Sequence, residues 1–400
     1  MHVFDYSFLK DMLVTSSFAK RLSRIESFRC NTRSFAEMYP DTARDMIRIA
    51  KIMSTRESNA IEGIGTEDSR LFGLLSGRVK PMGHDEMELL GYRDALERIH
   101  SGYDDFEITP ESILDLYSTL MSHVDADPVF KTRNNEVIER DSSGAIVKRF
   151  KTVPAKQVDE AMFQLTGAYM EARDDASIDN MLLIPCFILD FLRIHPFMDG
   201  NGRMSRLLTT LLLYQEGYDV CAYVSLEALI NKNKGDYYEA LERSGEGWFD
   251  DMNNYMPFIE YFIGIMFMAY REMDMRMAAC IGKDNKENRL ERVLMNISIP
   301  ISKREICMLM PDISETYVEM MLGKMVSSGK IERMGAKNSS RYLPRRGRRR
   351  SAQPQIGNNP SLGLIPYTSV SDPIHRRTPK RKEDSALSHP RSFRRSRSPA

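Results

Sequence analysis

Apolar residues recur at intervals of three and four over the first two thirds of the chain, and this period predicts a mainly α-helical fold. Thr109, Pro110 and Glu111 mark the start of one helix, because Thr is a favourable N-cap and Pro and acidic residues suit the first turn. The only clear β pattern in this part consists of 136–140 and 145–150, which flank four turn-forming residues and predict a hairpin. We therefore expect a helical domain with one hairpin.

The pattern changes near the C-terminus into short amphipathic helices. Ser302 and Glu305 form a capping box, and a second helix is expected to start at Ser314 or Thr316. A polar, hairpin-like segment follows at 330–342. This order of elements resembles a winged helix-turn-helix.

Charge argues against DNA reading by this C-terminal element. The candidate recognition helix carries Glu315 and Glu319 against only Lys324, whereas phosphate contacts require the opposite sign. We therefore favour a protein-docking or dimerising role, and nucleic-acid binding stays open as an alternative.

Basic residues gather at the end of the chain. Residues 344–400 contain 14 Lys and Arg against 3 Asp and Glu, although the whole chain has 56 of each class. This segment has too few apolar residues to offset the loss of chain entropy on folding, so we expect it to be disordered. A solubilising role and a contact with nucleic acid or a membrane both remain open for it.

Cysteine usage and hydropathy favour a cytoplasmic protein. The five cysteines are widely spaced and form no CxxC pair, so a disulfide framework and a zinc ribbon are not expected. Asp5 and Lys10 precede any long apolar run, which does not fit a signal peptide. The longest apolar runs, 181–194 and 258–270, contain Asp or Glu and fall short of the roughly 18 residues that a membrane span needs. We expect no membrane association through such spans.

The segment that carries chemistry runs from Ile194 to Arg206 with the sequence IHPFMDGNGRMSR. It joins an apolar helix that ends near Ile194 to a leucine-rich helix over 203–215. Gly200 and Gly202 let the loop backbone adopt positive φ and come close to an anion, and the amides of a helix N-terminus attract negative charge. This arrangement predicts a phosphate site.

Two arginines strengthen this prediction. Arg203 and Arg206 lie in or near the first turn, where the helix dipole disfavours cations, and a polyanion is the partner that would offset the penalty. Asp199 offers a hard oxygen ligand for Mg²⁺, and His195 is placed to act as a general base toward a hydroxyl. We expect Phe197 to be a core plug that fixes the loop.

The segment HPFMDGNGRMSR resembles the signature of the Fic family, HxFx(D/E)GNGRxxR, and meets each of its fixed positions. The similarity continues in TRNNEVI, at the family's β-hairpin flap, and in AYVSLEALINKNKGDYYEAL after the motif. The resemblance implies a helical Fic core with a β-hairpin flap. It further implies a protein adenylyltransferase that transfers AMP from ATP to a Ser, Thr or Tyr hydroxyl of a protein and releases pyrophosphate.

The resemblance also implies roles for the motif residues. His195 would deprotonate the target hydroxyl, and Asp199 would hold Mg²⁺ on the α- and β-phosphates. The phosphates would be held by the backbone amides around Gly200, Asn201 and Gly202 and by the guanidinium groups of Arg203 and Arg206.

Residues outside the motif would bind the target and the base. The flap would align the target segment by strand addition through Asn135, Glu136, Val137 and Ile138. Tyr237 and Tyr238 would lie near the nucleotide base. Gly245 departs from the pattern, because it stands where some relatives carry an Asn that follows this tyrosine pair.

A second segment, SNAIEG, resembles the family's inhibitory pattern (S/T)xxxE(G/N). Ser58 and Glu62 are four residues apart and share a helix face, and Gly63 suits a helix C-cap. By resemblance, Glu62 would pair with Arg206 in place of the ATP γ-phosphate and block a productive nucleotide pose, since carboxylate and phosphate compete for one guanidinium. The same glutamate could position a water molecule for de-AMPylation.

Together these features divide the chain into an N-terminal helical region at 1–108 with the inhibitory helix around 45–63, a Fic core at 109–275, a winged helix-turn-helix at 276–343 and a basic tail at 344–400. The expected partner is a protein substrate, which includes the chain itself, and a homodimer stays open. One alternative function is Fic-type transfer of UMP, phosphocholine or phosphate. Another is a winged-helix regulator that binds nucleic acid.

Overall fold

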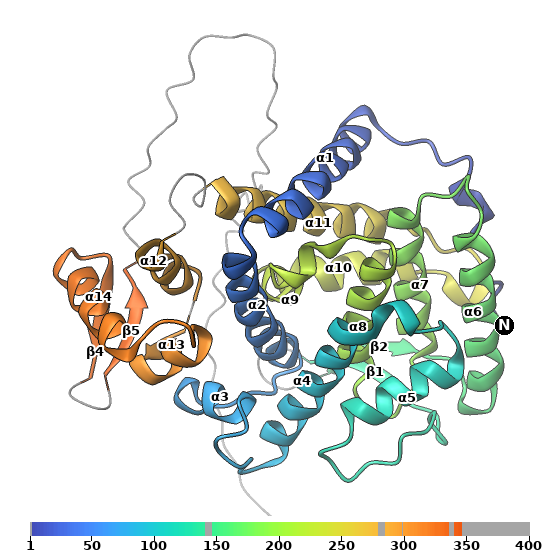
Figure 1. Ribbon diagram of the computed structural model, residues 1–400. Helices are drawn as coiled ribbons and strands as arrows, with labels where there is room; N and C mark the ends of the chain where they lie inside the picture. The colour runs from blue at the N-terminus through green and yellow to red at the C-terminus, as the bar shows by residue number, and fades with distance from the viewer. Residues whose placement is uncertain (1, 141–145, 279–284, 298, 336–339, 346–400) are drawn as a thin grey trace, which may run out of the picture. The chain divides into compact units, whose positions relative to one another are not determined.

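The computed structural model describes residues 2–140, 146–278, 285–297, 299–335 and 340–345 (Figure 1). The fold is mainly helical, as the apolar period predicts, with two small antiparallel sheets. The helices are α1 Ser16–Met38, α2 Pro40–Ile61, α3 Asp68–Leu75, α4 His84–Gly102, α5 Pro110–Leu120, α6 Val158–Arg173, α7 Asn180–Ile194, α8 Asn201–Gln215, α9 Leu226–Lys232, α10 Lys234–Gly245, α11 Met256–Ala278, α12 Lys286–Asn296, α13 Lys303–Leu309 and α14 Glu315–Ser327. The strands are β1 Glu136–Arg140, β2 Ile146–Lys151, β3 Ile301–Ser302, β4 Ile331–Met334 and β5 Arg341–Pro344.

Helix α7 lies at the centre of the main core and packs against α6, α8, α10 and α11. Twelve of its fifteen residues are buried, because its sequence is apolar on all sides. Its buried carboxylate, Asp190, accepts hydrogen bonds from the Tyr6 hydroxyl at 2.8 Å, Trp248 Nε1 at 2.7 Å and the Tyr255 hydroxyl at 3.0 Å. These bonds tie the N-terminal arm and the segment after α10 to the central helix.

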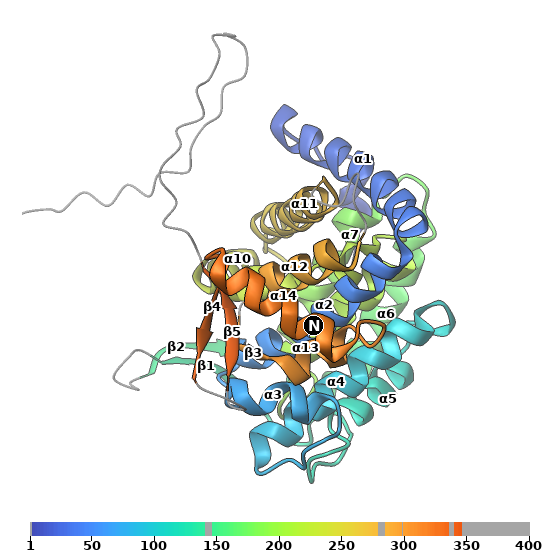
Figure 2. The same ribbon diagram turned by 60° about the vertical axis from the view of Figure 1, so that its left-hand side comes forward.

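The surrounding helices follow the expected local signals. The Thr109 side chain accepts a hydrogen bond from the Ser112 amide at 3.2 Å, which confirms the predicted start of α5. Helix α1 lies along α11 (Figures 1 and 2), and the two contribute Phe18, Ile25 and other buried side chains to the main core.

The predicted hairpin is present. Strands β1 and β2 pair antiparallel, with Glu136 opposite Lys151 and an irregularity between Glu139 and Arg140. The predicted turn at 141–144 lies outside the described residues.

The C-terminal subdomain, residues 286–344, contains α12, α13, α14 and a sheet with strand order β3-β5-β4. Both halves of the predicted capping box are present, since Ser302 and Glu305 each accept the other's backbone amide. Helix α14 starts after Ser314, whose side chain accepts from the Tyr317 amide, and Gly329 follows its end with a φ of 71°. The local signals in this part of the sequence are therefore confirmed.

This subdomain packs on α2 and α3. A second apolar core combines Ile49 and Met53 of α2 with side chains of α12, α13 and α14. Arg289 donates to Asp45 at 2.9 Å and to Asp312 at 2.8 Å, so a buried ion pair crosses the same contact. The subdomain thus contacts the helix that carries the predicted inhibitory pattern.

Residues 1–346 form one compact unit. The domain boundaries expected within it stay predictions, and the expected disorder of the basic tail concerns residues that lie, from 346 onward, outside the described ones. Within the described ranges, we find no helix that is long and apolar enough to cross a membrane.

Candidate functional site

The loop between α7 and α8 carries the predicted motif, and His195 ends α7 within it. His195 adopts a left-handed conformation with a φ of 54°, which is uncommon for a residue other than glycine. Its amide donates to the Phe191 carbonyl at 2.9 Å, so the helix closes on this residue. The chain turns again at Gly200, which has a φ of 77° and is the N-cap of α8. Only the five residues 196–200 therefore separate His195 from the start of α8 at Asn201.

Asn201 holds this loop in shape. Its Oδ1 accepts from the Phe197 amide and its Nδ2 donates to the Phe197 carbonyl, both at 2.9 Å. The Phe197 ring is fully buried and stacks on Tyr117 with the ring centroids 3.7 Å apart, which confirms its interpretation as a core plug. The side-chain clamp of Asn201 was not predicted from the sequence, which assigned only its backbone amide.

The N-terminus of α8 is suited to an anion. Among the described residues, no side chain caps it, and its first turn contains no acidic residue. The first-turn amides of a helix have no partners within the helix, and with the helix dipole they attract negative charge. Gly202 keeps the approach open, because a Cβ atom at this position would overlap the Glu62 carboxylate. An anion, here the carboxylate of Glu62, therefore already lies against this turn.

Arg203 is buried beneath the same turn, with 1% of its surface exposed. Its Nη2 donates to Glu88 Oε1 at 2.8 Å and lies 3.6 Å from Asp199 Oδ2. Its Nε and Nη1 are buried and have no hydrogen-bond partner among the described residues. An unpaired buried donor costs about 1–3 kcal/mol, so Arg203 retains capacity for the oxygen atoms of a ligand.

Arg206 is bonded to the end of α2. Its Nε donates to Ser58 Oγ at 2.8 Å, and its Nη2 donates to the Ser58 carbonyl at 2.9 Å and to Glu62 Oε1 at 2.8 Å. The structure therefore brings together Glu62 and Arg206, the pair that the family resemblance implies, and adds Ser58, for which no contact with Arg206 was predicted.

The end of α2 sets the position of Glu62. The helix stops at Ile61, Glu62 is its C-cap, and Gly63 follows with a φ of 82° that ends the helix. Lys234 of α10 donates to the Ile61 carbonyl. The Glu62 side chain keeps 33% of its surface exposed and is therefore less confined than the guanidinium it binds.

His195 is neutral at pH 7. Burial lowers the pKa of His195 to about 4, and the positive charge of Lys131 also lowers it. The Leu192 carbonyl, Glu62 and Asp199 act in the opposite direction and raise the pKa. Its Nδ1 is buried without a hydrogen-bond partner among the described residues. A neutral imidazole has the capacity to accept a proton from a nearby hydroxyl.

Asp199 is exposed beside the α8 N-terminus. Its Oδ1 accepts from the Gly200 amide at 2.6 Å, and most of its side chain faces solvent. Within the described residues, no group of three or more His, Cys, Asp and Glu side chains could hold a metal ion. A single carboxylate still fits Mg²⁺, which is commonly bound by one or two carboxylates together with substrate phosphates and water.

Tyr237 and Tyr238 of α10 lie near Arg206 and Glu62 and differ in exposure. Tyr237 is buried, and burial raises its pKa while the Arg206 guanidinium opposes this shift. Tyr238 is exposed, and Lys234 Nζ lies 5.6 Å from its ring centroid. Of the two, Tyr238 is therefore the ring that a ligand can reach.

Gly245 is covered by Arg193. A Cβ atom at Gly245 would lie 2.9 Å from Arg193 Nη1, and the guanidinium lies 5.8 Å from the ring centroid of Phe249. A larger residue at position 245 would therefore displace Arg193.

The base of the hairpin contacts the motif loop. Asn135 Nδ2 donates to the Phe197 carbonyl at 3.0 Å, so the first predicted flap residue reaches the site. Glu136, Val137 and Ile138 lie on β1 and pair with Lys151, Phe150 and Arg149 of β2. The hairpin thus starts at the loop that contains His195.

The geometry agrees with a comparison against known families. Residues 107–213 match the Fic/DOC family. This match includes His195, Asp199 and the two arginines, but not α2 or the C-terminal subdomain.

Curated relatives carry the name protein adenylyltransferase Fic. The one from Drosophila virilis is 26% identical over 221 residues, which cover 53% of this chain and 42% of the relative. The one from Drosophila ananassae is 28% identical over 174 residues, which cover 43% of this chain and 31% of the relative. The chain thus spans less than half the length of these relatives.

Solved structures show the same fold. A Fic family protein from Desulfovibrio desulfuricans G20 matches with a TM-score of 0.54 at 21% identity, over 83% of this chain and 97% of that protein. A Fic domain containing signaling protein from Bacteroides thetaiotaomicron VPI-5482 matches with a TM-score of 0.53 at 22% identity, over 64% and 96%.

Three residues outside the segment 194–206 complete the site and were missed from the sequence. Glu88 holds Arg203, and its signal was Arg203 itself, a first-turn cation that requires an anion. Lys131 donates to Asn135 Oδ1 at 2.8 Å and to Thr152 Oγ1 at 2.9 Å. Nothing in the local sequence distinguishes Lys131 or Thr152 from surface residues of a hairpin.

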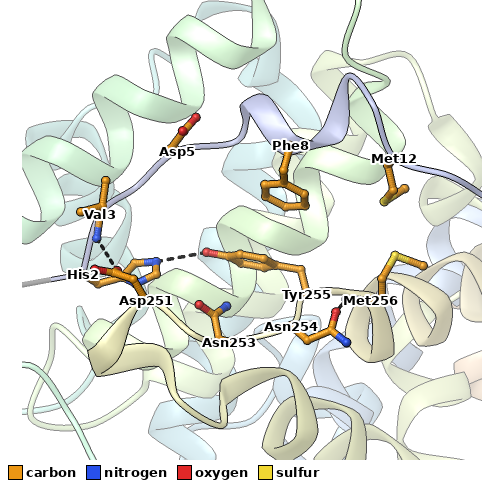
Figure 3. Close-up of a pocket in the computed structure, with 10 residues that line it drawn as sticks. All are labelled: His2, Val3, Asp5, Phe8, Met12, Asp251, Asn253, Asn254, Tyr255 and Met256. Carbon is orange, nitrogen blue, oxygen red and sulfur yellow. Dashed lines mark hydrogen bonds and ion pairs between the residues drawn. The ribbon is translucent and has the colours of Figure 1, made fainter.

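A cavity of about 330 Å³ lies apart from the segment 194–206, under the N-terminal arm (Figure 3). Its lining includes Asp5, Phe8, Asn253 and Tyr255, and the His2 ring bonds to the Tyr255 hydroxyl at 3.2 Å. No residue predicted for the site is among the described residues that line this cavity.

Proposed function

We propose that this chain is a protein adenylyltransferase that transfers AMP from ATP to a Ser, Thr or Tyr hydroxyl of a protein, and that Glu62 restrains it. One combination of groups in a single segment carries the proposal. The loop and helix from His195 to Arg206 combine α8 amides that no described side chain caps, the Nε and Nη1 of Arg203, which have no partner among the described residues, and the neutral imidazole of His195. The Fic/DOC match and the names of the Drosophila relatives support it.

In the proposed reaction, the target hydroxyl loses its proton to His195 as its oxygen forms a bond to the α-phosphorus. The bond from the α-phosphorus to the bridging oxygen breaks, and pyrophosphate leaves with that electron pair. The α8 amides and Arg203 stabilise the charge that develops on the phosphate oxygens, and holding both reactants in place lowers the entropic part of the barrier. Mg²⁺ held by Asp199 would neutralise phosphate charge when bound.

The proposed restraint follows from the position of the Glu62 carboxylate. It bonds to Arg206 at 2.8 Å and lies against Gly202, where a phosphate would approach the α8 N-terminus. One anion excludes the other, because both require the same guanidinium and the Glu62 carboxylate already occupies the space beside Gly202. Opening requires that the Glu62 carboxylate move away from Arg206 and Gly202.

We assign target docking to the hairpin that starts at Asn135. An extended target segment can pair with an exposed strand edge, and Asn135 connects this hairpin to the loop beside His195. Backbone pairing selects little for sequence, so the hydroxyl that reaches His195 defines the modified residue.

For residues 286–344 we infer a winged helix-turn-helix that docks protein rather than DNA. The one basic residue of α14, Lys324, is bonded to Glu287 at 2.6 Å. Lys303 is engaged by Glu315 and Glu319 at 3.1 Å and 3.0 Å. These pairs neutralise Lys324 and Lys303, so α14 offers little positive charge for phosphates, whereas the apolar side of the subdomain packs on α2.

The decisive test uses the full chain with Mg²⁺ and ATP labelled at the α-phosphate. We expect the Glu62→Gly variant to acquire more protein-bound label than the wild type, and the intact mass to rise by one AMP unit per modification. Adding His195→Ala should abolish the label. Glu67→Gly, which removes an exposed glutamate nearby, is the matched control and should behave as the wild type.

Further nucleotides separate the alternatives. Label from γ-labelled ATP would indicate phosphate transfer, and modification by UTP or CDP-choline would indicate the other Fic-type reactions. Absence of α-label from every variant, in the presence of a hydroxyl-bearing protein substrate, would overturn the proposed function.

A further inference from the structure

Lys131 is a buried cation in an unusual environment. Only 3% of its surface is exposed, and its Nζ donates to Asn135 Oδ1 at 2.8 Å, Thr152 Oγ1 at 2.9 Å and the Ile194 carbonyl at 3.2 Å. Every one of these acceptors is neutral, and no carboxylate among the described residues forms an ion pair with it. Burial of an ammonium group without a counter-charge costs free energy, and such costs are typical of functional sites.

Lys131 forms hydrogen bonds to the residues on both sides of His195. Its side chain binds the carbonyl of Ile194, the residue before His195, and its backbone amide donates to the carbonyl of Pro196, the residue after, at 2.8 Å. The left-handed conformation of His195 costs free energy and persists only where the surroundings impose it. The two bonds from Lys131 supply such a constraint.

The same ammonium group connects the peptide groups beside His195 to the hairpin. Asn135 precedes β1 and Thr152 follows β2, and the Thr152 hydroxyl also lies 2.8 Å from the Asn135 carbonyl. Lys131 therefore joins both ends of the hairpin to the peptide groups that flank His195.

We propose that Lys131 is a positioning residue of the transfer reaction, which holds His195 in its left-handed conformation and links it to the hairpin that docks the target. The catalytic meaning of this role rests on the proposed function. The link itself is a property of the fold and does not depend on the nucleotide.

The charge of Lys131 has a second effect. It lowers the pKa of His195, after burial, while Glu62, Asp199 and the Leu192 carbonyl act in the opposite direction. Burial also lowers the pKa of Lys131 to about 8. Lys131 is thus charged at pH 7 and favours the neutral form of the base.

The test uses the full chain with Lys131→Met, Lys131→Arg and the control Thr152→Val, which removes one acceptor of the network and keeps the charge. The first readout is the pKa of His195 by NMR of histidine-labelled protein, with His195→Ala to assign the signal. We expect Lys131→Met to raise this pKa, and Lys131→Arg and Thr152→Val to leave it low.

The second readout is AMP transfer in the Glu62→Gly background. We expect Lys131→Met to lower kcat by about 100-fold, the order expected for a displaced catalytic group, with little change in KM for ATP. Lys131→Arg should restore part of kcat, which a purely structural loss would not predict.

Each outcome decides one proposal. An unchanged His195 pKa in Lys131→Met, or a kcat loss no larger than that of Thr152→Val, would overturn the role of Lys131. If Lys131→Met fails to fold, Lys131→Gln replaces it, because an amide keeps hydrogen-bonding capacity without the charge; a His195 pKa as low as in the wild type together with a kcat equal to that of Glu62→Gly alone would overturn the role. If no variant transfers AMP while the NMR shift is present, the proposed function fails and the Lys131 link to His195 stands.

Discussion

Removal of the Glu62 carboxylate should strengthen ATP binding by an amount that follows from its contacts. Glu62 forms one hydrogen bond to Arg206, at 2.8 Å, and a hydrogen bond to a charged group contributes about 1.5–3 kcal/mol. Because 33% of the Glu62 side chain is exposed, solvent screening lowers this to about 1–2 kcal/mol. The open, nucleotide-competent state is then a minor one.

The apparent affinity of a ligand equals its intrinsic affinity multiplied by the fraction of protein molecules that are in the binding-competent state. A closed state favoured by about 1–2 kcal/mol lowers ATP affinity by about 6- to 30-fold, and Glu62→Ala should recover this factor. Alanine is preferable to glycine here because it removes the carboxylate without loosening the backbone at the end of α2.

The assay is calorimetric titration of the full chain with a non-hydrolysable ATP analogue and Mg²⁺. Glu67→Ala serves as the charge-matched control and should bind as the wild type. An unchanged or weaker affinity in Glu62→Ala would refute the idea that this carboxylate and the phosphate share one site.

Three further predictions concern the base, the metal and the buried carboxylate. His195→Ala should abolish AMP transfer but keep ATP binding. Because burial lowers the pKa of His195 to about 4, the transfer rate of Glu62→Gly should fall on the acid side only as the pH nears 4. A fall centred near pH 6.5 would contradict this role of His195. Asp199→Ala should raise the Mg²⁺ concentration needed for half-maximal transfer, and an unchanged requirement would exclude Asp199 as the ligand. Burial raises the pKa of Asp190 to about 7, above its unfolded value near 4, so its contribution to stability is full below pH 4 and is lost as the pH rises through 7. The thermal unfolding temperature of the wild type should therefore fall between pH 5 and 8. That of Asp190→Asn should depend less on pH over the same range.

Local signals in the sequence were sufficient for many elements. The caps at Thr109, Ser302 and Ser314 were predicted because a cap involves residues two or three positions apart. The hairpin was predicted because strand alternation and turn residues are also local. The packing of the C-terminal subdomain on α2 was not, since it depends on pairs such as Asp45 and Arg289, 244 positions apart.

The residues of the site likewise divide into those that local sequence predicts and those that depend on the fold. His195, Asp199 and Arg203 lie in one short segment, and their residue types alone indicate the chemistry of the site. The contact of Glu62 with Arg206, across 144 positions, was predicted only through a family resemblance. Lys131 and Thr152 were missed because their importance arises from burial. A lysine before a hairpin is ordinarily solvated, and only the fold shows that this one is enclosed beside His195.

The most direct measurement is a crystal structure of the Glu62→Ala variant with Mg²⁺ and a non-hydrolysable ATP analogue. We expect the phosphates to lie on the first-turn amides of α8, with Nε or Nη1 of Arg203 bonded to phosphate oxygens and Arg206 released from the end of α2. A nucleotide bound elsewhere, such as in the cavity beside His2 and Tyr255, with the α8 N-terminus free of phosphate, would contradict the central claim.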